Sequence, residues 1–294
     1  MSIESVGILG AGLMGLGMAC SAARAGFRVV VRDIDPAREA LAREAGLTVV
    51  PTAAALARNA DVLLIVLVDA GQIDDALAGS EGVLAALSPG RLVLVCSTIG
   101  PEDSERICAR ISATGAFAID APISGGPARA HAGSLSMMLA GLPASLEAAR
   151  PLLEAVATRH FVIGERQGDA ARAKLVNNLM AGIHLMAAAE AVALAERLGL
   201  DPAQITDLVS ASSGQSWMAD DRLPRALAGD LAPRAQSQVL AKDLRLANAA
   251  AASVGVTLPL GTVALQLFGD LCDDGWRHQD DAAALAYYRR RFGG

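Results

Sequence analysis

Apolar residues follow two different patterns along the chain. Up to about residue 163, short continuous apolar runs alternate with longer segments that begin near a proline and end near a glycine. Val6–Leu9, Asp61–Val68 and Arg91–Cys96 are three of these runs. Such runs are typical of parallel strands that helices cover on both faces. The alternation predicts a doubly wound α/β domain over residues 1–164.

The pattern changes after Gly164. A helical spacing of apolar residues then continues from about Gln167 to Leu198 without a proline. A helix of that length runs roughly 45 Å at about 1.5 Å per residue. We expect no strand after residue 163, and further helices from Pro202 and over about 236–254, 259–273 and 280–291. The sequence therefore predicts an all-α domain over residues 165–294, joined to the first domain by the long helix.

The first apolar run leads into a glycine motif. Gly10-Ala11-Gly12-Leu13-Met14-Gly15 has the spacing G-x-G-x-x-G, between a predicted strand and a predicted helix. The first glycine permits a tight turn, the second lets the backbone approach a pyrophosphate, and the third allows close packing of helix on strand. The motif predicts a Rossmann-type dinucleotide site, in which Gly10, Gly12, Leu13, Met14 and Gly15 contact the cofactor. A glycine-rich turn without a ligand is the alternative.

Asp33 bears on which dinucleotide is bound, because it follows the second strand, 18 residues after Gly15. A carboxylate at this position accepts hydrogen bonds from the adenosine ribose hydroxyls and repels a 2′-phosphate. Asp33 therefore favours NAD over NADP, although the neighbouring Arg32 weakens that argument.

A second glycine pair follows a later strand. In Asp120-Ala121-Pro122-Ile123-Ser124-Gly125-Gly126, the polar groups come directly after the strand end, where open α/β sheets bind ligands. The Ser124 hydroxyl and the two glycine N–H groups could hold a substrate carboxylate; an ordinary tight turn is equally compatible. Leu67-Val68 and Thr98, which follow two other strands, could lie beside the nicotinamide ring.

The long helix carries candidate chemistry near its start. Lys174 and Asn178 are four residues apart and share one helix face, with Asn177 beside them. Desolvation in this apolar helix is expected to lower the pKa of Lys174, which suits it to exchange a proton with a substrate hydroxyl. The alternative is a lysine whose stem packs on the core. Lys242-Asp243 is either a cofactor contact or a surface ion pair.

Composition argues against several other functions. The net charge is −6 and aromatic residues make up 3%, so nucleic acid is not an expected partner. The four cysteines and four histidines show no ligand spacing, so we expect no metal and buried, reduced thiols. There is no signal-peptide pattern, and the longest apolar stretch, Leu175–Ala189, is shorter than the ~20 residues that span a membrane. We expect a cytoplasmic protein without a membrane partner.

Four segments resemble the β-hydroxyacid dehydrogenase family, the group of 3-hydroxyisobutyrate dehydrogenase. They are GAGLMG (10–15), DAPISGG (120–126), GDAARAKLVNN (168–178) and KDLRLA (242–247), and they follow the family's order and spacing. The resemblance implies reversible hydride transfer between a hydroxy-acid carbon and a nicotinamide cofactor. It implies that Lys174 is the catalytic acid/base and that Thr98 and Lys242 lie on the cofactor side. It also implies substrate binding by Ser124, Gly125, Gly126 and Asn178.

The chain departs from the family pattern at two places. Ala170 stands where a second glycine often precedes the lysine, and Leu67-Val68 stands where Leu-Pro is common. GQSWMADDR (214–222), LVDAGQ (67–72) and STIGP (97–101) look most like the L-threonate dehydrogenase branch, which oxidises four-carbon sugar acids at C2 with NAD. Trp217 in the first of these segments is either a substrate contact or a core or interface anchor.

Two other functions stay open. One is an NADPH-dependent reductase of a semialdehyde, such as tartronate or succinic semialdehyde, against which Asp33 argues. The other is a non-enzymatic nucleotide-sensing module, against which Lys174 argues. Because the helical domain is poor in charge, we expect it to bury a face in a homodimer or homotetramer.

Overall fold

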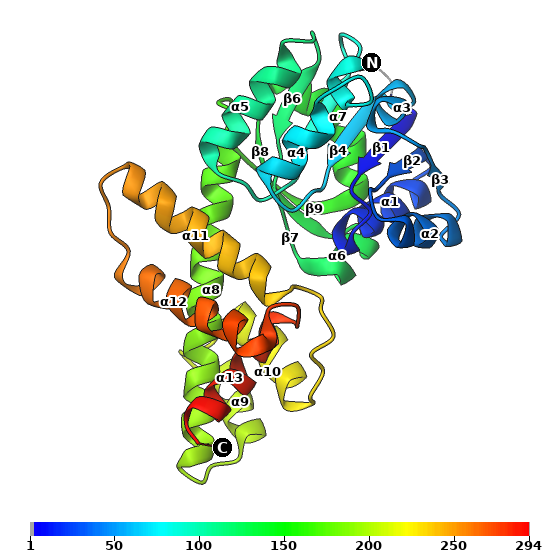
Figure 1. The fold of residues 1–294 in the computed structure, drawn as a ribbon. Helices are drawn as coiled ribbons and strands as arrows, with labels where there is room; N and C mark the ends of the chain where they lie inside the picture. The colour runs from blue at the N-terminus through cyan, green and yellow to red at the C-terminus, as the bar shows by residue number, and fades with distance from the viewer. Residues whose placement is uncertain (1–2, 294) are drawn as a thin grey trace. The chain divides into compact units, whose positions relative to one another are not determined.

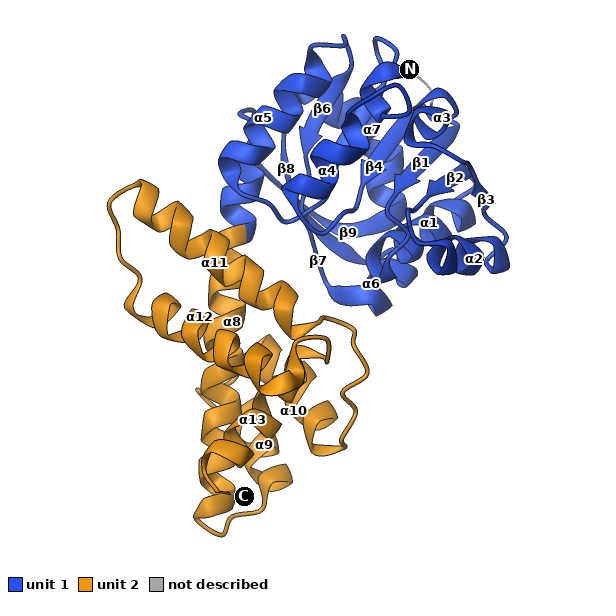
Figure 2. Cartoon of the chain, in the orientation of Figure 1, with its two compact units in different colours: residues 1–174 blue, residues 175–294 orange. Residues whose placement is uncertain are grey.

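The computed structural model describes residues 3–293 and divides into two compact units, residues 1–174 and 175–294 (Figure 1, Figure 2). The division falls within the long helix α8 (Asp169–Arg197). The first unit contains the nine-stranded sheet, and the second is built from helices. The α/β fold with a following helical region is therefore confirmed.

The sheet has the strand order β3-β2-β1-β4-β5-β6-β8-β7, and β9 pairs with β8. Strands β3 to β6 of this order are parallel, whereas β8 is antiparallel to β6 and β7 and parallel to β9. The strands are β1 (Ser5–Leu9), β2 (Arg28–Arg32), β3 (Thr48–Val49), β4 (Val62–Ile65), β5 (Leu92–Val95), β6 (Phe117–Asp120), β7 (Ile123–Ser124), β8 (Leu135–Ala140) and β9 (Ala157–Gly164).

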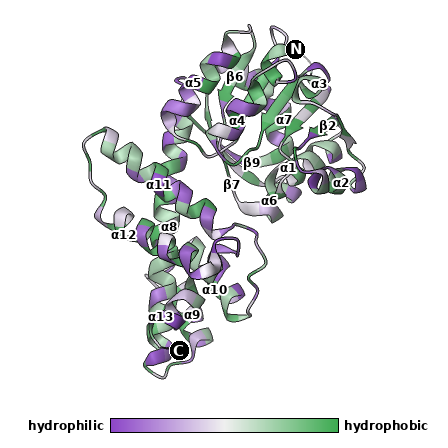
Figure 3. Ribbon diagram, viewed as in Figure 1, coloured by the Kyte–Doolittle hydropathy of each residue, from purple (hydrophilic) through white to green (hydrophobic). Residues whose placement is uncertain are grey.

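Helices cover both faces of this sheet. Successive side chains of a strand point to opposite faces, so they enter two separate cores. Val62 and Leu64 of β4 belong to one core, and Leu63 and Ile65 belong to the other. The central strands β4 and β5 are accordingly apolar throughout, whereas the outer helices have polar faces (Figure 3). The helices of this unit are α1 (Leu13–Arg24), α2 (Pro36–Glu44), α3 (Ala53–Arg58), α4 (Ala70–Leu77), α5 (Pro101–Ser112), α6 (Gly126–Ala132) and α7 (Pro143–Val156), with a 3₁₀ turn η1 (Val83–Ala85).

The helical unit packs around α8. Its core joins Leu185 and Met186 of α8 to Phe268, which is fully buried, and to Leu244 and Tyr288. The elements are α9 (Pro202–Ser210), α10 (Trp217–Leu227), α11 (Ser237–Ser253), α12 (Pro259–Leu271), a π turn η2 (Cys272–Trp276), a 3₁₀ turn η3 (Asp281–Ala283) and α13 (Ala284–Arg291).

Several elements differ from the sequence prediction. The segment after Asp120 is not a loop, because it forms β7 and then α6. The pair of glycines and Pro127 are typical of turns, so the sequence did not predict these two elements. Helix α10 was not predicted, because Pro224 lies inside it. The helix expected over 259–273 ends at Leu271, and the one expected over 280–291 is divided into η3 and α13.

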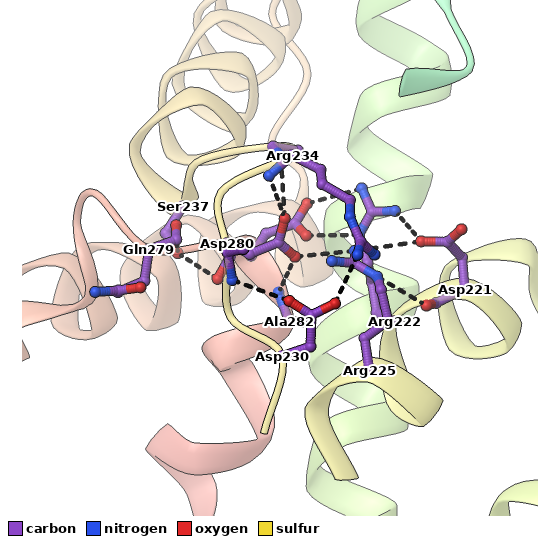
Figure 4. Close-up of polar contacts among 12 residues, drawn as sticks. Asp221, Arg222, Arg225, Asp230, Arg234, Ser237, Gln279, Asp280 and Ala282 are labelled. Carbon is purple, nitrogen blue, oxygen red and sulfur yellow. Dashed lines mark hydrogen bonds and ion pairs between the residues drawn. The ribbon is translucent and has the colours of Figure 1, made fainter. Parts of the chain in front are cut away.

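A buried polar cluster holds the end of the helical unit together (Figure 4). Asp280 is fully buried, accepts hydrogen bonds from the N–H groups of Arg234 (2.8 Å) and Ala235 (3.1 Å), and pairs with Arg225 at 2.9 Å. Asp281 is paired with Arg222 at 2.6 Å. The cluster therefore ties α10, the segment after it and η3 to one another.

Helix α8 is long and apolar enough to span a membrane by length and composition alone. The sequence prediction had considered only its least charged stretch, which is shorter. In the helical unit, α8 supplies buried core residues such as Leu185, Ala189 and Val192. A core helix has the same composition, so this property does not distinguish the two environments.

Candidate functional site

The carboxyl ends of four parallel strands lie in register across the first unit. Leu9 of β1 pairs with Ile65 of β4, Ile65 with Val95 of β5, and Val95 with Asp120 of β6. The predicted site segments of the α/β unit follow these strands, except Asp33, which follows the neighbouring β2, and the start of α8. The fold thus brings the glycine loop, Leu67-Val68, Thr98 and Ser124–Gly126 to the same edge of the sheet, where parallel α/β sheets bind ligands.

The glycine loop is packed so tightly that two of its glycines have no room for a side chain. A Cβ on Gly10, whose φ is +99°, would lie 2.4 Å from the Val66 carbonyl oxygen, and a Cβ on Gly15 would lie 1.8 Å from the Gly10 carbonyl oxygen. At Gly12 a Cβ would meet only Arg38, at 3.5 Å. The backbone at Gly12 is therefore open on the side where a phosphate would approach.

The first turn of α1 fits an anion from outside the chain. Its N-cap is Gly12, which has no side chain to cap the helix, and the first turn has no acidic residue. The neighbouring helices α2 and α4, in contrast, are capped by Asp35 and Asp69. Uncapped N–H groups and the positive end of the helix dipole are the usual partners of a dinucleotide pyrophosphate.

Asp33 lies against the glycine loop. Its carboxylate accepts hydrogen bonds from the N–H groups of Ala11 (2.6 Å) and Asp35 (2.9 Å). Arg32 faces Glu39, with 2.6 Å between guanidinium and carboxylate. Burial of Glu39 opposes its ionisation, but the hydrogen bonds from Arg32, the Asp33 N–H and Arg43, together with the Arg32 charge, hold the pKa of Glu39 below its ordinary value. The cation beside Asp33 is thus already paired inside the protein.

The residues after β4 and β5 are linked by a serine. The Ser97 hydroxyl, which is buried, accepts a hydrogen bond from the Leu67 N–H at 3.0 Å. Val68 is 51% exposed and Thr98 is half-buried, so both side chains can contact a ligand at this edge. The Ser97 hydroxyl is therefore already engaged in a hydrogen bond with the main chain.

The glycines of the 120–126 segment turn the chain from β7 into α6. Gly125 has φ +135° and Gly126 has φ +75°, and both conformations strain any other residue. Helix α6 then packs closely on α1, because a Cβ on Gly17 would lie 2.8 Å from the Ala130 Cβ. This packing holds Ser124–Gly126 next to the helix that follows the glycine loop.

Lys174 is the last residue of the first unit and is buried, with 6% of its surface exposed. It is one of only two lysines among the 25 basic residues of the chain, and the other is Lys242. An arginine stays protonated in proteins, whereas a lysine can release its proton. In a chain that otherwise uses arginine as its basic residue, both lysines are residues that the sequence analysis singled out as site candidates.

In the helical unit, Asn178 and Lys242 are joined through Asp243, which the sequence prediction left between two interpretations. Asp243 is buried, accepts a hydrogen bond from the Asn178 amide at 2.5 Å, and lies 2.8 Å from the Lys242 ammonium. The Lys242 contact is an ion pair by distance and does not have hydrogen-bond geometry. Asn177 donates to the Asn178 carbonyl oxygen at 2.9 Å, so the amide of Asn178 is oriented from both sides.

The cysteines form no disulfide in the described chain. Cys96, Cys108 and Cys272 are buried as predicted, whereas Cys20, within α1, is half-buried. Burial raises the pKa of the Cys96 and Cys108 thiols, and the nearby Asp120 charge adds to the effect. These thiols are therefore poor nucleophiles.

Comparisons with known proteins agree with this geometry. Residues 5–164 match the family described as the NAD binding domain of 6-phosphogluconate dehydrogenase, and residues 168–288 match the NAD-binding family of NADP-dependent 3-hydroxyisobutyrate dehydrogenase. The chain is 37% identical to the L-threonate dehydrogenase of Cupriavidus necator, over 97% of this chain and 96% of that relative.

Two solved structures are similar over nearly the whole chain. The crystal structure of 3-hydroxyisobutyrate dehydrogenase from Salmonella typhimurium has a TM-score of 0.89 and 35% identity, covering 96% of this chain and 99% of that one. Psf3 in complex with NADP⁺ and 2-OPP has a TM-score of 0.88 and 29% identity, with the same two coverages of 96% and 99%. The chain therefore belongs to the 3-hydroxyisobutyrate dehydrogenase family, and it is an NAD(P)-dependent enzyme that acts on the CH–OH group of a small hydroxy acid.

Proposed function

We propose that this chain oxidises a small hydroxy acid with NAD and that Lys174 is its acid/base. The observation that carries the proposal is the buried Lys174 in a chain with only two lysines. Burial removes water from the amine and so favours its neutral form, which can accept a proton.

The residues of the chain then divide the work as follows. Ser124 and the N–H groups of Gly125 and Gly126 hold the substrate carboxylate, and Asn178 donates to or accepts from a substrate hydroxyl. Lys174 removes the proton of the hydroxyl that is oxidised and returns it in the reverse direction, a step that typically contributes about 10² to 10⁴-fold in rate. Lys242, oriented by Asp243, lies on the cofactor side. When bound, the nicotinamide ring supplies the acceptor for the hydride.

The remaining assignments concern the cofactor. Gly10, Gly12, Leu13, Met14 and Gly15 bind the pyrophosphate, Leu67, Val68 and Thr98 lie beside the nicotinamide, and Asp33 binds the adenosine ribose. The pairing of Arg32 with Glu39 supports a preference for NAD, because that guanidinium is already neutralised. The similarity to Psf3, solved with NADP⁺, keeps the NADPH-dependent semialdehyde reductase as the second candidate.

Cofactor titrations separate the two candidates. We expect a lower dissociation constant for NADH than for NADPH by intrinsic NADH fluorescence. Asp33→Asn should narrow that difference about tenfold, or about 1.4 kcal/mol, because the repulsion of the 2′-phosphate is removed. Tighter binding of NADPH by the unchanged chain would overturn the assignment of Asp33.

The substrate we propose is a four-carbon sugar acid such as L-threonate, or a 3-hydroxyisobutyrate-like acid. The similarity to L-threonate dehydrogenase supports the first. Initial rates with NAD over L-threonate, D-erythronate, D-glycerate, 3-hydroxyisobutyrate and 3-hydroxypropionate test it. Fastest turnover of a four-carbon acid is the expected result. No measurable turnover of any of these acids, by protein that binds NADH, would contradict the proposal and favour the nucleotide-sensing alternative.

We further propose that residues 165–294 serve substrate binding and oligomerisation in a cytoplasmic homodimer or homotetramer, with residues 1–164 as the dinucleotide domain. Large apolar side chains stay exposed on the helical unit, among them Val254 (73%) and Leu260 (67%). Apolar surface of this kind is usually buried in an interface. Light scattering that gives a monomer at micromolar concentration would contradict this proposal.

A further inference from the structure

The junction between β6 and the start of α8 is held by one buried carboxylate. Asp120, the last residue of β6, is 1% exposed, and its Oδ2 accepts hydrogen bonds from the N–H groups of Gly168 (3.0 Å) and Ala171 (2.9 Å). Gly168 and Ala171 flank the first residues of α8. A carboxylate from a distant strand therefore takes the place of an N-cap side chain, which Gly168 cannot supply.

A glutamine strengthens the same junction. The Gln167 amide donates to the Ala118 carbonyl oxygen at 2.7 Å, and its side-chain oxygen accepts from the Asp120 N–H at 3.2 Å. Four hydrogen bonds thus join the end of β6 to the first turn of α8. Ion pairs add to the contacts of that turn: Arg172 pairs with Glu105 at 2.7 Å and with Asp169 at 2.9 Å.

Lys174 follows Ala171 by three residues, so it lies one turn further along the same helix. The first turn of a helix is its least stable part, because its N–H groups have no partner within the helix. Where these N–H groups are fixed, the direction of the next turn is fixed as well. Misplacement of a reacting group by about 1 Å can cost about 100-fold in rate.

We propose that Asp120 is a positioning residue that sets the location of the Lys174 amine by anchoring the first turn of α8. The inference rests on the proposed function, in which Lys174 is the acid/base. It adds to that function a residue to which the proposed function assigns no contact with substrate or cofactor. The surroundings agree with this role: Asp120 receives backbone N–H groups and lies near the buried Cys96 and Cys108.

The two lysines of the chain make a direct test possible without cofactor. Protein grown with lysine labelled with ¹³C at Cε gives one resonance from Lys174 and one from Lys242, which Lys242→Arg assigns. In Asp120→Ala we expect the Lys174 resonance and its titration midpoint to move toward those of a solvent-exposed lysine. We expect kcat to fall about 100-fold, while the dissociation constant of NADH stays within about twofold of the unchanged chain, because the glycine loop is untouched.

Conservative variants separate positioning from simple stability. Asp120→Asn retains an oxygen that can accept both N–H groups, so we expect kcat within about threefold and an unmoved Lys174 resonance. Gln167→Ala removes two of the four hydrogen bonds and replaces Asp120→Ala as the test variant if that protein does not fold. We expect Gln167→Ala to move the Lys174 resonance in the same direction and to lower kcat several-fold. Asp61→Asn is the matched control: Asp61 also accepts two backbone N–H groups in this unit, but at the opposite end of the sheet.

The outcomes separate the two proposals. If Asp120→Ala and Gln167→Ala lower only the midpoint of thermal unfolding, as Asp61→Asn should, and leave the Lys174 resonance and kcat unchanged, Asp120 is structural only and the inference is wrong. If instead Lys174→Arg turns over at the original rate, the proposed function of Lys174 fails. The ¹³C resonance then still decides whether Asp120 holds the start of α8.

Discussion

Each unit contains a buried aspartate that accepts several backbone hydrogen bonds. The two aspartates differ in the groups that compensate for the burial of their charge. Asp280 in the helical unit is paired with Arg225, and Asp120 in the α/β unit relies on N–H groups. Burial opposes the ionisation of Asp280, but the Ala235 N–H and the Arg225 guanidinium hold its pKa below the ordinary value. Burial raises the pKa of Asp120, and the hydrogen bonds from Ala171 and Gly168 offset only part of that.

The difference teaches what each carboxylate is suited for. A buried aspartate with a guanidinium partner is a stable structural tie, because both charges are neutralised and hydrogen-bonded. A buried aspartate held by dipoles alone costs more to keep charged, and its value lies in fixing the direction of the backbone that it binds. The first kind occurs in the cluster of Figure 4, and the second occurs at the start of the helix that carries Lys174.

The largest effect is expected at Asp280. Asp280→Ala leaves the N–H groups of Arg234 and Ala235 without their acceptor and leaves the Arg225 guanidinium with Asp221 as its remaining partner, which should lower the free energy of unfolding by about 3–5 kcal/mol. Both tryptophans, Trp217 and Trp276, lie in the helical unit, so urea unfolding followed by tryptophan fluorescence reports on this unit.

The matched control for Asp280 is Asp273→Asn in the same unit, which removes an exposed pair with Arg277. We expect that control to cost about 0–1 kcal/mol. Equal losses in the two variants would mean that the buried cluster of Figure 4 adds nothing beyond surface pairing.

The next effect concerns Asp61, at the edge of the sheet opposite to the site. Burial opposes its ionisation, but hydrogen bonds from the Ser5 hydroxyl and from the N–H groups of Glu4 and Ser5 hold its pKa at about 2. Because the folded pKa is lowered, the stabilisation is present above the unfolded value near 4 and is lost as pH falls through about 2.

Asp61→Asn should therefore cost about 2 kcal/mol at pH 7. The cost should shrink as pH approaches 2. Unfolding by guanidinium, followed by circular dichroism at several pH values, measures it. A cost that does not change with pH would mean that Asp61 acts through its shape and not its charge. We expect kcat to stay unchanged in this variant.

The smallest effect is a difference between Asp120 and Asp280 in the direction in which their contributions to stability change with pH. The folded pKa of Asp120 is raised, so its contribution to stability is fully present below the unfolded pKa and is lost as pH rises through the folded value. The folded pKa of Asp280 is lowered, so its contribution is present above the unfolded pKa and is lost as pH falls.

Between pH 4 and 7, the unfolding free energy of the unchanged chain minus that of Asp120→Asn should therefore fall with rising pH. The corresponding difference for Asp280→Asn should stay constant there and decrease only in more acidic solution. Slopes of the same sign for both variants would remove the distinction between the two carboxylates.

Much of the fold could be predicted from the sequence, because its signals are local. The apolar runs and the proline and glycine boundaries gave the strands β1 to β6 and the long helix α8. Helices α6 and α10 were missed since each contains proline, and α6 also starts at a glycine pair, signals that describe turns equally well. Tertiary packing, such as the fit of Ala130 of α6 against Gly17 of α1, decided these cases.

The candidate site was predictable only where a motif carries its own geometry. The glycine loop and Lys174 stand out by residue type and spacing, although their roles stay predictions. The function of Asp120 and the bridge from Asn178 to Lys242 through Asp243 depend on contacts between residues 48 to 65 positions apart. A single sequence has no signal for such pairs. The sequence does carry a different signal for Lys174 and Lys242, which counting residues would have found: the chain contains no other lysine.

The central claim is that Lys174 exchanges a proton with the substrate. Lys174→Arg keeps a positive charge of similar reach but cannot release its proton. We would measure kcat for the hydroxy acid that the unchanged chain oxidises fastest, together with the dissociation constant of NADH. The account predicts a loss in kcat of about 1,000-fold, with NADH binding unchanged. Turnover within about threefold of the original, with the same pH profile, would contradict it.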